Sequence, residues 1–236
     1  MEEQVQRLAN KVWQIYQTTP ADKRVLIGIA GIPGSGKTTF SEAITTRIND
    51  IASRQTPESP TPAAFLPMDG FHYPRSYLSA QADAALYHTR RGASFTFDAA
   101  KFLGVIRKLR NASLENEIKV PSFDHAVKDP IEDDIIIAST QRIVIVEGNY
   151  VALNADIWRD AAALFDELWF VEVDFDRARE RLAPRHVKAG IVASLQDGYK
   201  RADENDLING KEIVDNKMPI QEIVYSTEDD GWSPGV

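Results

Sequence analysis

A short glycine-rich segment carries the most specific chemistry in the chain. The residues Gly31-Ile-Pro-Gly-Ser-Gly-Lys-Thr38 match the pattern G-x-x-x-x-G-K-[S/T] completely. Glycines let such a loop wrap so that backbone N–H groups point at phosphate oxygens, and the following helix adds its positive end. In this pattern the lysine reaches the β- and γ-phosphates and the threonine hydroxyl faces Mg²⁺. We therefore expect a nucleoside triphosphate to bind along Gly31, Ile32, Pro33, Gly34, Ser35, Gly36, Lys37, Thr38 and Thr39.

Two carboxylates each follow an apolar run, as expected at the carboxyl ends of buried strands. Asp69 comes directly after residues 63–68, and Gly70 would allow a close approach to it. A carboxylate at this place can accept the proton of a hydroxyl that attacks the γ-phosphate, which predicts Asp69 as a catalytic base. Glu147 follows the run 142–146 and could hold Mg²⁺ directly or through water. The structural alternatives are a turn-capping aspartate and a solvated acid at a strand end.

A row of basic residues near the end of the chain could stabilise the transferring phosphoryl group. Arg177, Arg181, Arg185 and Lys188 recur at spacings of four, four and three residues, which places them on one face of a straight helix. The alternative is a solvated basic face. Because Pro184 should break or kink the helix near residue 183, we expect Arg181 rather than Arg185 to reach the phosphates.

A second basic pair precedes a glycine. Arg90 and Arg91 could meet a carboxylate or phosphate on an acidic acceptor, whereas a neutral nucleoside would not need them. The alternative is that Arg90 and Arg91 are ordinary exposed residues with no ligand. Near the end of the chain, Asn205 and Asn209 are candidates for contacts with the adenine base.

These residues require a framework of strands that alternate with helices. The pattern predicts an amphipathic helix that ends near Thr19 and predicts further helices over 37–53 and 98–110 and from about 176. Buried strands are expected at 24–30, 63–68, 142–146 and 167–173, and a shorter strand at 118–120. Such alternation indicates an α/β, doubly wound, mostly parallel sheet with ligands at the carboxyl ends of its strands. Residues 70–120 interrupt it and are interpreted as an acceptor-binding cap.

Composition narrows the class of protein. The chain has 236 residues and a net charge of −8, which suits a single domain over 1–236 and argues against a nucleic-acid binder. It contains no cysteine, so disulfides, a thiol nucleophile and a thiolate zinc site are excluded. No uncharged apolar run reaches the length of a membrane span, and Glu2 and Glu3 do not suit a targeting peptide. A cytoplasmic location is expected, and the oligomeric state, a homo-oligomer included, is left open.

At this point several motifs together resemble a known family. The phosphate loop, the strand end Glu147-Gly148 and the run Val173-Asp-Phe-Asp-Arg-Ala-Arg-Glu-Arg-Leu182 are similar to uridine kinases. The segments Met68-Asp-Gly-Phe71, Arg90-Arg-Gly-Ala-Ser-Phe-Thr-Phe-Asp98 and Pro121-Ser-Phe-Asp-His-Ala-Val-Lys-Asp129 are more similar to bacterial-type pantothenate kinases. Over about residues 24–210 the chain resembles P-loop small-molecule kinases, which also include phosphoribulokinase. It most resembles their uridine-kinase-like branch of unassigned substrate.

The resemblance implies a P-loop NTPase fold with an arginine-bearing lid at 177–200. It also implies roles for particular residues. Asp69 would be the catalytic base, Lys37 and Arg181 would be electrostatic clamps, and Thr38 and Glu147 would hold the metal. The acceptor pocket would be lined by His72, Tyr73, Phe123 and His125, with Arg90 as a further candidate. Two positions depart from uridine kinases: Phe123 replaces a usual tyrosine, and Lys128 stands where they carry a histidine.

We therefore expect an ATP- and Mg²⁺-dependent kinase that phosphorylates a hydroxyl of a small metabolite. A uridine-like nucleoside ranks first as acceptor, with pantothenate or a sugar as alternatives, and the choice between ATP and GTP stays open. The rival from another class is an ATP-binding switch without a small-molecule acceptor.

Overall fold

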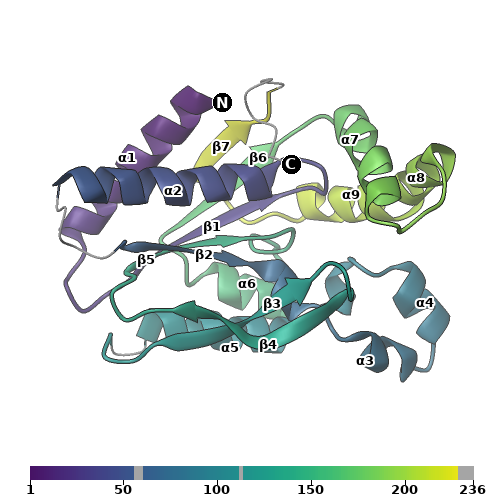
Figure 1. Ribbon diagram of the computed structural model, residues 1–236, viewed down its shortest axis with the longest axis horizontal. Helices are drawn as coiled ribbons and strands as arrows, with labels where there is room; N and C mark the ends of the chain where they lie inside the picture. Colours follow the sequence, from purple (N-terminus) through teal and green to yellow (C-terminus); the bar gives the residue numbers. More distant parts are fainter. Residues whose placement is uncertain (56–60, 112–113, 228–236) are drawn as a thin grey trace.

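A five-stranded parallel sheet forms the centre of the molecule (Figure 1). The computed structural model describes residues 1–55, 61–111 and 114–227. The strand order is β2-β5-β1-β6-β7, and each neighbouring pair is parallel. The strands span β1 Val25–Gly31, β2 Ala63–Pro67, β5 Ile143–Glu147, β6 Glu167–Glu172 and β7 Glu222–Tyr225. The expected strands of this sheet are confirmed to within two residues at each end.

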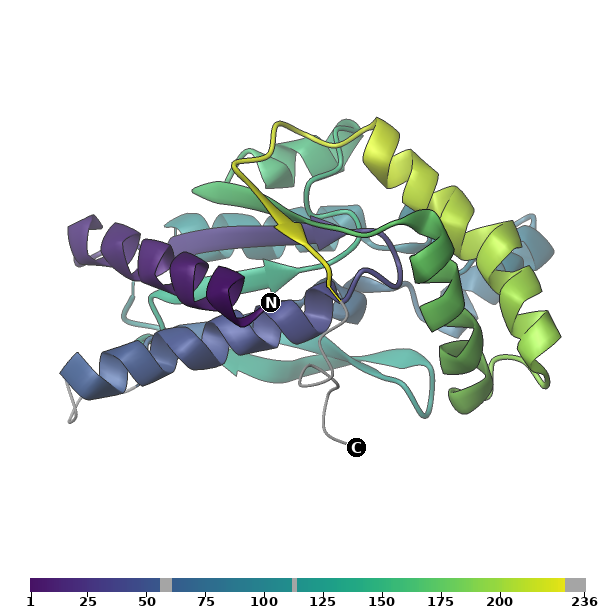
Figure 2. The same ribbon diagram turned by 90° about the horizontal axis from the view of Figure 1, so that it is seen from above.

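Helices cover both faces of the sheet, as the continuous apolar strands require. Helices α1 (Glu2–Thr18) and α2 (Lys37–Gln55) pack on one face, and α5 (Ala99–Asn111) and α6 (Asp156–Ala162) pack on the other. Figures 1 and 2 show α1 and α2 lying alongside each other. Successive β1 residues alternate between two cores, so Ile27 packs toward α1 and α2 while Leu26 packs toward α5 and α6. The expected doubly wound α/β architecture is confirmed.

Short elements and a hairpin lie between β2 and β5. The short elements are η1 (Met68–Phe71), α3 (Arg75–Ser79), α4 (Ala84–Thr89) and η2 (Ser94–Thr96). After α5 comes an antiparallel hairpin of β3 (Ile118–Asp124) and β4 (Asp129–Ile137). The sequence predicted only the start of β3 and missed β4, because most of β4 is exposed and its polar and apolar residues do not alternate.

The chain after β6 is mostly helical. Helix α7 (Phe175–Lys188) leads to α8 (Leu195–Arg201), the π-helical turn η3 (Ala202–Asp206) and α9 (Leu207–Asp215). The stretch 195–215 is almost continuously helical. The sequence also predicts a frayed end at 226–236 and a proline-rich surface loop at 54–62, and most of both segments lies outside the described residues. No helix among the described residues is both long enough and apolar enough to cross a membrane.

Candidate active site

The phosphate loop joins β1 to α2 in the conformation that its glycines permit. Gly34 and Gly36 have φ angles of 81° and 84°, a region that L side chains rarely adopt. A Cβ at Gly34 would lie 2.9 Å from the carbonyl oxygen of Ala178, so α7 packs directly against the loop. Lys37 opens α2, and its Nζ donates to the carbonyl oxygen of Ile32 over 3.4 Å. The loop therefore has the curled backbone and the placed lysine that a triphosphate requires.

A buried pair of charges lies at the start of α2. The Nζ of Lys37 is 3.9 Å from Oε1 of Glu147, and the Glu147 residue is 5% exposed. Burial lowers the pKa of Lys37, while Glu147 and Asp69 act to raise it. Burial raises the pKa of Glu147 to about 7, against the opposing effects of Lys37 and of a hydrogen bond with the Thr38 side chain. The carboxyl group therefore sits where a further cation would stabilise its charged form.

The donors around Glu147 suit Mg²⁺. The carboxylate of Glu147 and the hydroxyl of Thr38 are hard oxygen donors, and they lie in hydrogen-bond contact beside the phosphate loop. Mg²⁺ prefers one or two such protein oxygens together with water and substrate phosphates. Thr38 and Glu147 would hold the ion, which would neutralise charge on the phosphate oxygens when bound.

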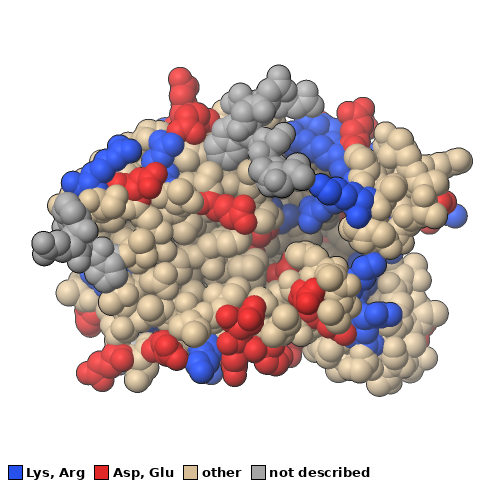
Figure 3. Space-filling view, in the orientation of Figure 1, with Lys and Arg blue, Asp and Glu red and all other residues tan. Residues whose placement is uncertain are grey.

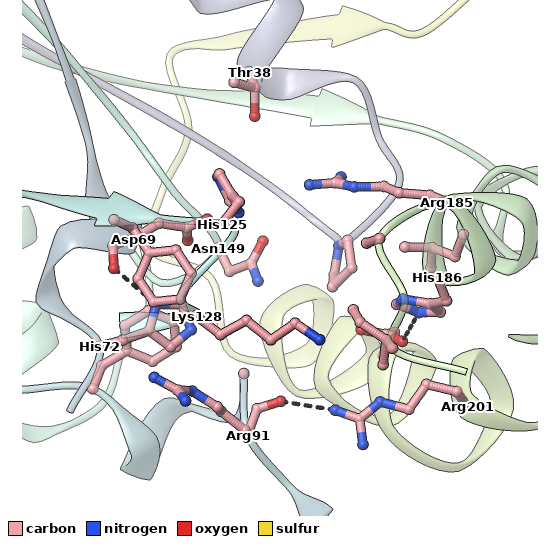
Figure 4. A pocket seen from close by; sticks show the side chains of 18 of the residues that line it. Thr38, Asp69, His72, Arg91, His125, Lys128, Asn149, Arg185, His186 and Arg201 are labelled. Atoms are coloured by element: carbon pink, nitrogen blue, oxygen red, sulfur yellow. Dashed lines mark hydrogen bonds and ion pairs between the residues drawn. The ribbon is translucent and has the colours of Figure 1, made fainter. Parts of the chain in front are cut away.

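Asp69 lies in η1, directly after β2. A Cβ on the next residue, Gly70, would lie 2.2 Å from the carbonyl oxygen of Pro121, so β3 packs on η1 at backbone distance. The carbonyl oxygen of Asp69 is 2.8 Å from Nδ1 of His72, and the dashed line in Figure 4 marks this contact. The His72 ring is 3.9 Å from the Phe97 ring, centroid to centroid. These contacts fix the backbone that carries the Asp69 carboxylate.

His72 lies among aromatic and basic groups on the same side. Its ring centroid is 4.8 Å from that of Phe123, which in turn is 5.2 Å from that of His125. Burial lowers the pKa of His72, Asp69 acts to raise it, and Arg91 and His125 act to lower it. All five side chains line a cavity of about 600 Å³ that also includes Lys37, Thr38 and Glu147. The structure thus brings the expected residues Asp69, His72, Phe123 and His125 together with the phosphate loop.

Two expected acceptor residues lie outside the cavity lining. Arg90 donates to Oδ1 of Asn205 over 2.9 Å and to Oδ1 of Asn209 over 2.7 Å. Both asparagines are buried, and Arg90 links the segment after α4 to η3 and α9. The expected contacts of the two asparagines with adenine stay a prediction. The Tyr73 ring instead stacks on Tyr77, with centroids 4.0 Å apart. The neighbouring Arg91 lines the cavity in place of Arg90.

Helix α7 runs through its proline. It continues from Phe175 to Lys188, so Pro184 does not break the helix near Ala183. Helix α8 packs against this point so closely that a Cβ on Gly198 would lie 2.5 Å from the carbonyl oxygen of Ala183. This packing supports the helix across the hydrogen bond that Pro184 cannot make.

The continuous helix places two arginines at different sites. Arg185 lines the cavity, and Figure 4 shows its guanidinium group extending across the cavity on the Thr38 side. Arg181 does not line the cavity; it donates to the carbonyl oxygen of Gly34 over 3.2 Å and to Oγ of Ser226 over 2.9 Å. The arginine that faces the phosphate end is therefore Arg185, and Arg181 instead binds the phosphate loop.

The cavity lining also includes residues that the sequence did not assign to the site. Lys128 comes from the hairpin turn, Asn149 follows β5, and Arg201 ends α8. Oδ1 of Asn149 is buried with no hydrogen-bond partner among the described residues. His186 and Asp206 pair across the helices, with Nε2 and Oδ2 2.8 Å apart. The spacing from Asp69 to Lys128 or Arg201 exceeds any local pattern, so only the fold could reveal these positions.

The geometry combines two functions in one cavity. Its phosphate end has a curled loop, a buried lysine and a carboxylate beside a threonine hydroxyl. Its other end has the Asp69 carboxylate with histidine, aromatic and basic neighbours. Figure 3 shows lysine and arginine side chains around a hollow between the α7–α8 region and the α3–α4 region. The arrangement suits transfer of a phosphoryl group from a nucleotide to a second molecule.

Comparison with known proteins agrees with this site. The family model for the "Phosphoribulokinase / Uridine kinase family" matches residues 26–177. The chain is 45% identical over 159 residues to "ATP-dependent kinase-like protein notR'" of Aspergillus versicolor, and the matched region covers 66% of this chain and 92% of that protein. It is 38% identical over 202 residues to "Putative uridine kinase C227.14" of Schizosaccharomyces pombe, which covers 86% and 83% respectively.

A solved structure shows the same fold. The crystal structure of YFH7 from Saccharomyces cerevisiae matches with a TM-score of 0.83 over 95% of this chain and 99% of that chain, at 24% identity. The parallel sheet and the phosphate loop after β1 are those of a P-loop NTPase. With the family model covering more than half of its length, the chain belongs to the phosphoribulokinase/uridine kinase family.

Proposed function

We propose that this protein is an ATP- and Mg²⁺-dependent kinase that transfers the γ-phosphoryl group to a hydroxyl of a small metabolite. One observation carries the proposal: the Asp69 carboxylate and the Lys37 side chain of the phosphate loop line the same cavity. A nucleotide-binding switch would need the phosphate end alone. The additional wall of His72, Phe123 and His125 supports a second, acceptor-binding function.

Each side chain has a defined role in the proposed reaction. The acceptor oxygen attacks the γ-phosphorus, the bond to the β-phosphate oxygen breaks, and the Asp69 carboxylate takes the hydroxyl proton. Lys37 and Arg185 stabilise negative charge on the phosphoryl oxygens and on the leaving ADP. Helix α8 and η3 pack against α7, and their residues Arg201 and Asp206 help to enclose the cavity, which limits wasteful transfer to water.

An assay of acceptor-dependent ADP formation tests this proposal. The protein would be mixed with Mg²⁺ and ATP and screened against nucleosides, pantothenate, sugars, hydroxy acids and sugar phosphates. We expect one compound to stimulate ADP formation and Asp69→Asn to lower kcat about 10²–10⁴-fold, the usual range for loss of a general base. The KM for ATP should stay near its wild-type value.

A matched variant controls for the charge change. Asp22→Asn makes the same substitution at an exposed aspartate in the turn before β1 and should leave the activity unchanged. Full activity of Asp69→Asn would remove the base from this mechanism. Slow ATP hydrolysis that no compound stimulates, and that Asp69→Asn does not alter, would instead support the switch.

A further inference from the structure

The cavity is richer in positive than in negative side chains. Among the described residues, its lining includes three carboxylates, from Asp69, Glu147 and Asp206. It also includes six lysine and arginine side chains, from Lys37, Arg75, Arg91, Lys128, Arg185 and Arg201. The basic residues come from several elements along the cavity and are not confined to the phosphate loop.

Five of the six basic residues divide into two groups along the cavity. Lys37 opens α2 at the phosphate loop, and Arg185 acts electrostatically on both Lys37 and Glu147. Arg91 and Arg201 lie at the opposite end from Thr38, and Lys128 extends across the middle (Figure 4). Arg91 also acts electrostatically on His72, which places it on the Asp69 side. The second group therefore faces the acceptor and not the triphosphate.

Most of the charge in this second group is not neutralised by the protein. Lys128 Nζ donates to the carbonyl oxygen of Gly190 over 3.3 Å, and no carboxylate in the described ranges lies within ion-pair distance of it. Arg201 donates to two carbonyl oxygens, those of Thr89 and Arg91, and likewise has no carboxylate partner in those ranges. Arg91 pairs with Asp129 over 3.2 Å. Three cations thus share one carboxylate.

A further observation indicates that this end suits an anion. Arg75 also lines the cavity, and burial together with this nearby like charge lowers the pKa of Arg91. Clustered like charges cost free energy, and a bound anion would offset that cost. A neutral nucleoside or sugar would leave the charge uncompensated.

We propose that the acceptor is an anion: a small hydroxyl compound with a carboxylate or phosphate group that Arg91, Lys128 and Arg201 bind. This proposal rests on the proposed kinase function, because it assigns the charge of the molecule whose hydroxyl meets Asp69. It reverses the order expected from the sequence, in which a neutral nucleoside ranked first.

Calorimetry with matched compounds tests the charge directly. The full-length protein would be saturated with Mg²⁺ and the non-hydrolysable analogue AMP-PNP, so that the phosphate end is filled. Within each set of titrants only the charged group differs. The sets are glycerol, glycerate and glycerol 3-phosphate; pantothenol and pantothenate; and ribose and ribose 5-phosphate. Uridine is titrated as a neutral nucleoside. We expect an anionic member to bind at least 10-fold more tightly than its neutral counterpart, as a charge-assisted hydrogen bond implies. The glycerol set distinguishes carboxylate from phosphate.

Variants locate the binding group. Lys128→Gln should weaken binding of that anion about 10- to 100-fold and leave AMP-PNP affinity unchanged. Lys128 has a φ of 62°, and glutamine meets the same backbone strain as lysine, so the variant tests charge rather than folding. Lys128→Arg should restore most of the affinity. Lys119→Gln, at an exposed position of the same hairpin, is the matched control and should bind like the wild type.

The outcomes separate this proposal from the kinase function. The proposal of an anionic acceptor is overturned if neutral members bind as tightly as anionic ones or more tightly. It is also overturned if Lys128→Gln does not change the binding of the anion. Turnover of a neutral member would in that case leave the kinase function standing. Failure of every anion in these sets to bind also overturns the proposal of an anionic acceptor. Anion binding that depends on Lys128, without phosphoryl transfer from ATP above the Asp69→Asn level, supports the anion site and contradicts the kinase function.

Discussion

The close packing of η1 against β3 predicts a large effect from one added methyl group. In Gly70→Ala the new Cβ would lie 2.2 Å from the carbonyl oxygen of Pro121 and 2.6 Å from its carbonyl carbon. Non-bonded heavy atoms prefer separations near 3.5 Å, so these two backbones must separate by roughly 1 Å. No rotamer change can relieve a contact between a Cβ and a backbone. We expect the free energy of unfolding to fall by about 3 kcal/mol, at the upper end of the cost of overpacking.

The same substitution elsewhere provides the control. Gly104 lies inside α5, and a Cβ there meets nothing within 4 Å. Gly104→Ala should therefore raise the free energy of unfolding by about 0.5–1 kcal/mol, because alanine favours a helix more than glycine does. Urea denaturation followed by circular dichroism would measure both variants.

The displacement should also reach the chemistry. Because Gly70 is next to Asp69, Gly70→Ala should lower kcat more than 10-fold even where the protein remains folded, since small misplacements of a catalytic group are costly. Gly104→Ala should keep the wild-type kcat. A Gly70→Ala protein that is as stable and active as the wild type would refute the argument that this backbone contact positions the base.

Three further predictions follow from the lining and from the link to η3 and α9. Arg185→Gln should lower kcat about 10²–10³-fold, as expected for loss of a transition-state donor, whereas Lys188→Gln on the same helix should leave kcat unchanged. Equal kcat values for the two variants in steady-state kinetics would contradict the role of Arg185. Since the pKa of Glu147 is raised to about 7, its carboxyl group is protonated below that pH and ionised above it. The KM for Mg²⁺ should therefore be about tenfold higher at pH 6 than at pH 8. A KM for Mg²⁺ that does not change with pH would contradict this. Arg90→Met should lower the free energy of unfolding by about 2 kcal/mol or more, because it leaves two buried amide oxygens unpaired. Arg107→Met, at an exposed position, should leave the free energy of unfolding almost unchanged. Equal stability of the two variants in urea denaturation would count against the link from Arg90 to η3 and α9.

The sequence predicted those parts of the site that lie next to a strand end. Buried parallel strands are continuous apolar runs, and the residues that follow them meet at one edge of the sheet. Lys37, Asp69 and Glu147 could therefore be assigned to a common site before their distances were known. The phosphate loop was the easiest of these, because its glycines and its lysine occur in one contiguous motif.

Side-chain direction could not be read from the sequence. Arg90 and Arg91 are adjacent and directly follow the end of α4. The backbone there directs Arg91 to the cavity lining and Arg90 to two buried amide groups, which the sequence does not show. Arg181 and Arg185 are one helical turn apart, and the choice between them depended on whether Pro184 breaks the helix. Packing of α8 against α7 decided this, and such tertiary support has no local signal.

The hairpin was missed for a related reason. Its turn places Lys128 at a φ of 62° without a glycine or an Asn-Gly pair, which are the usual markers of such a turn. Its second strand is largely exposed and acidic, so it resembles a loop. Lys128 itself was noticed in the sequence only as a departure from the uridine-kinase pattern, whereas the fold makes it part of the cavity lining.

The most direct measurement of the central claim is the stoichiometry of phosphoryl transfer. The protein would be incubated with Mg²⁺, ATP and the acceptor that gives the greatest stimulation, and ADP and phosphorylated acceptor would be quantified together by chromatography and mass spectrometry. A kinase that uses Asp69 as its base should form one phosphorylated acceptor for each ADP, and both products should fall together in Asp69→Asn. ADP and free phosphate formed in equal amounts, with no phosphorylated acceptor and no effect of Asp69→Asn, would contradict the account.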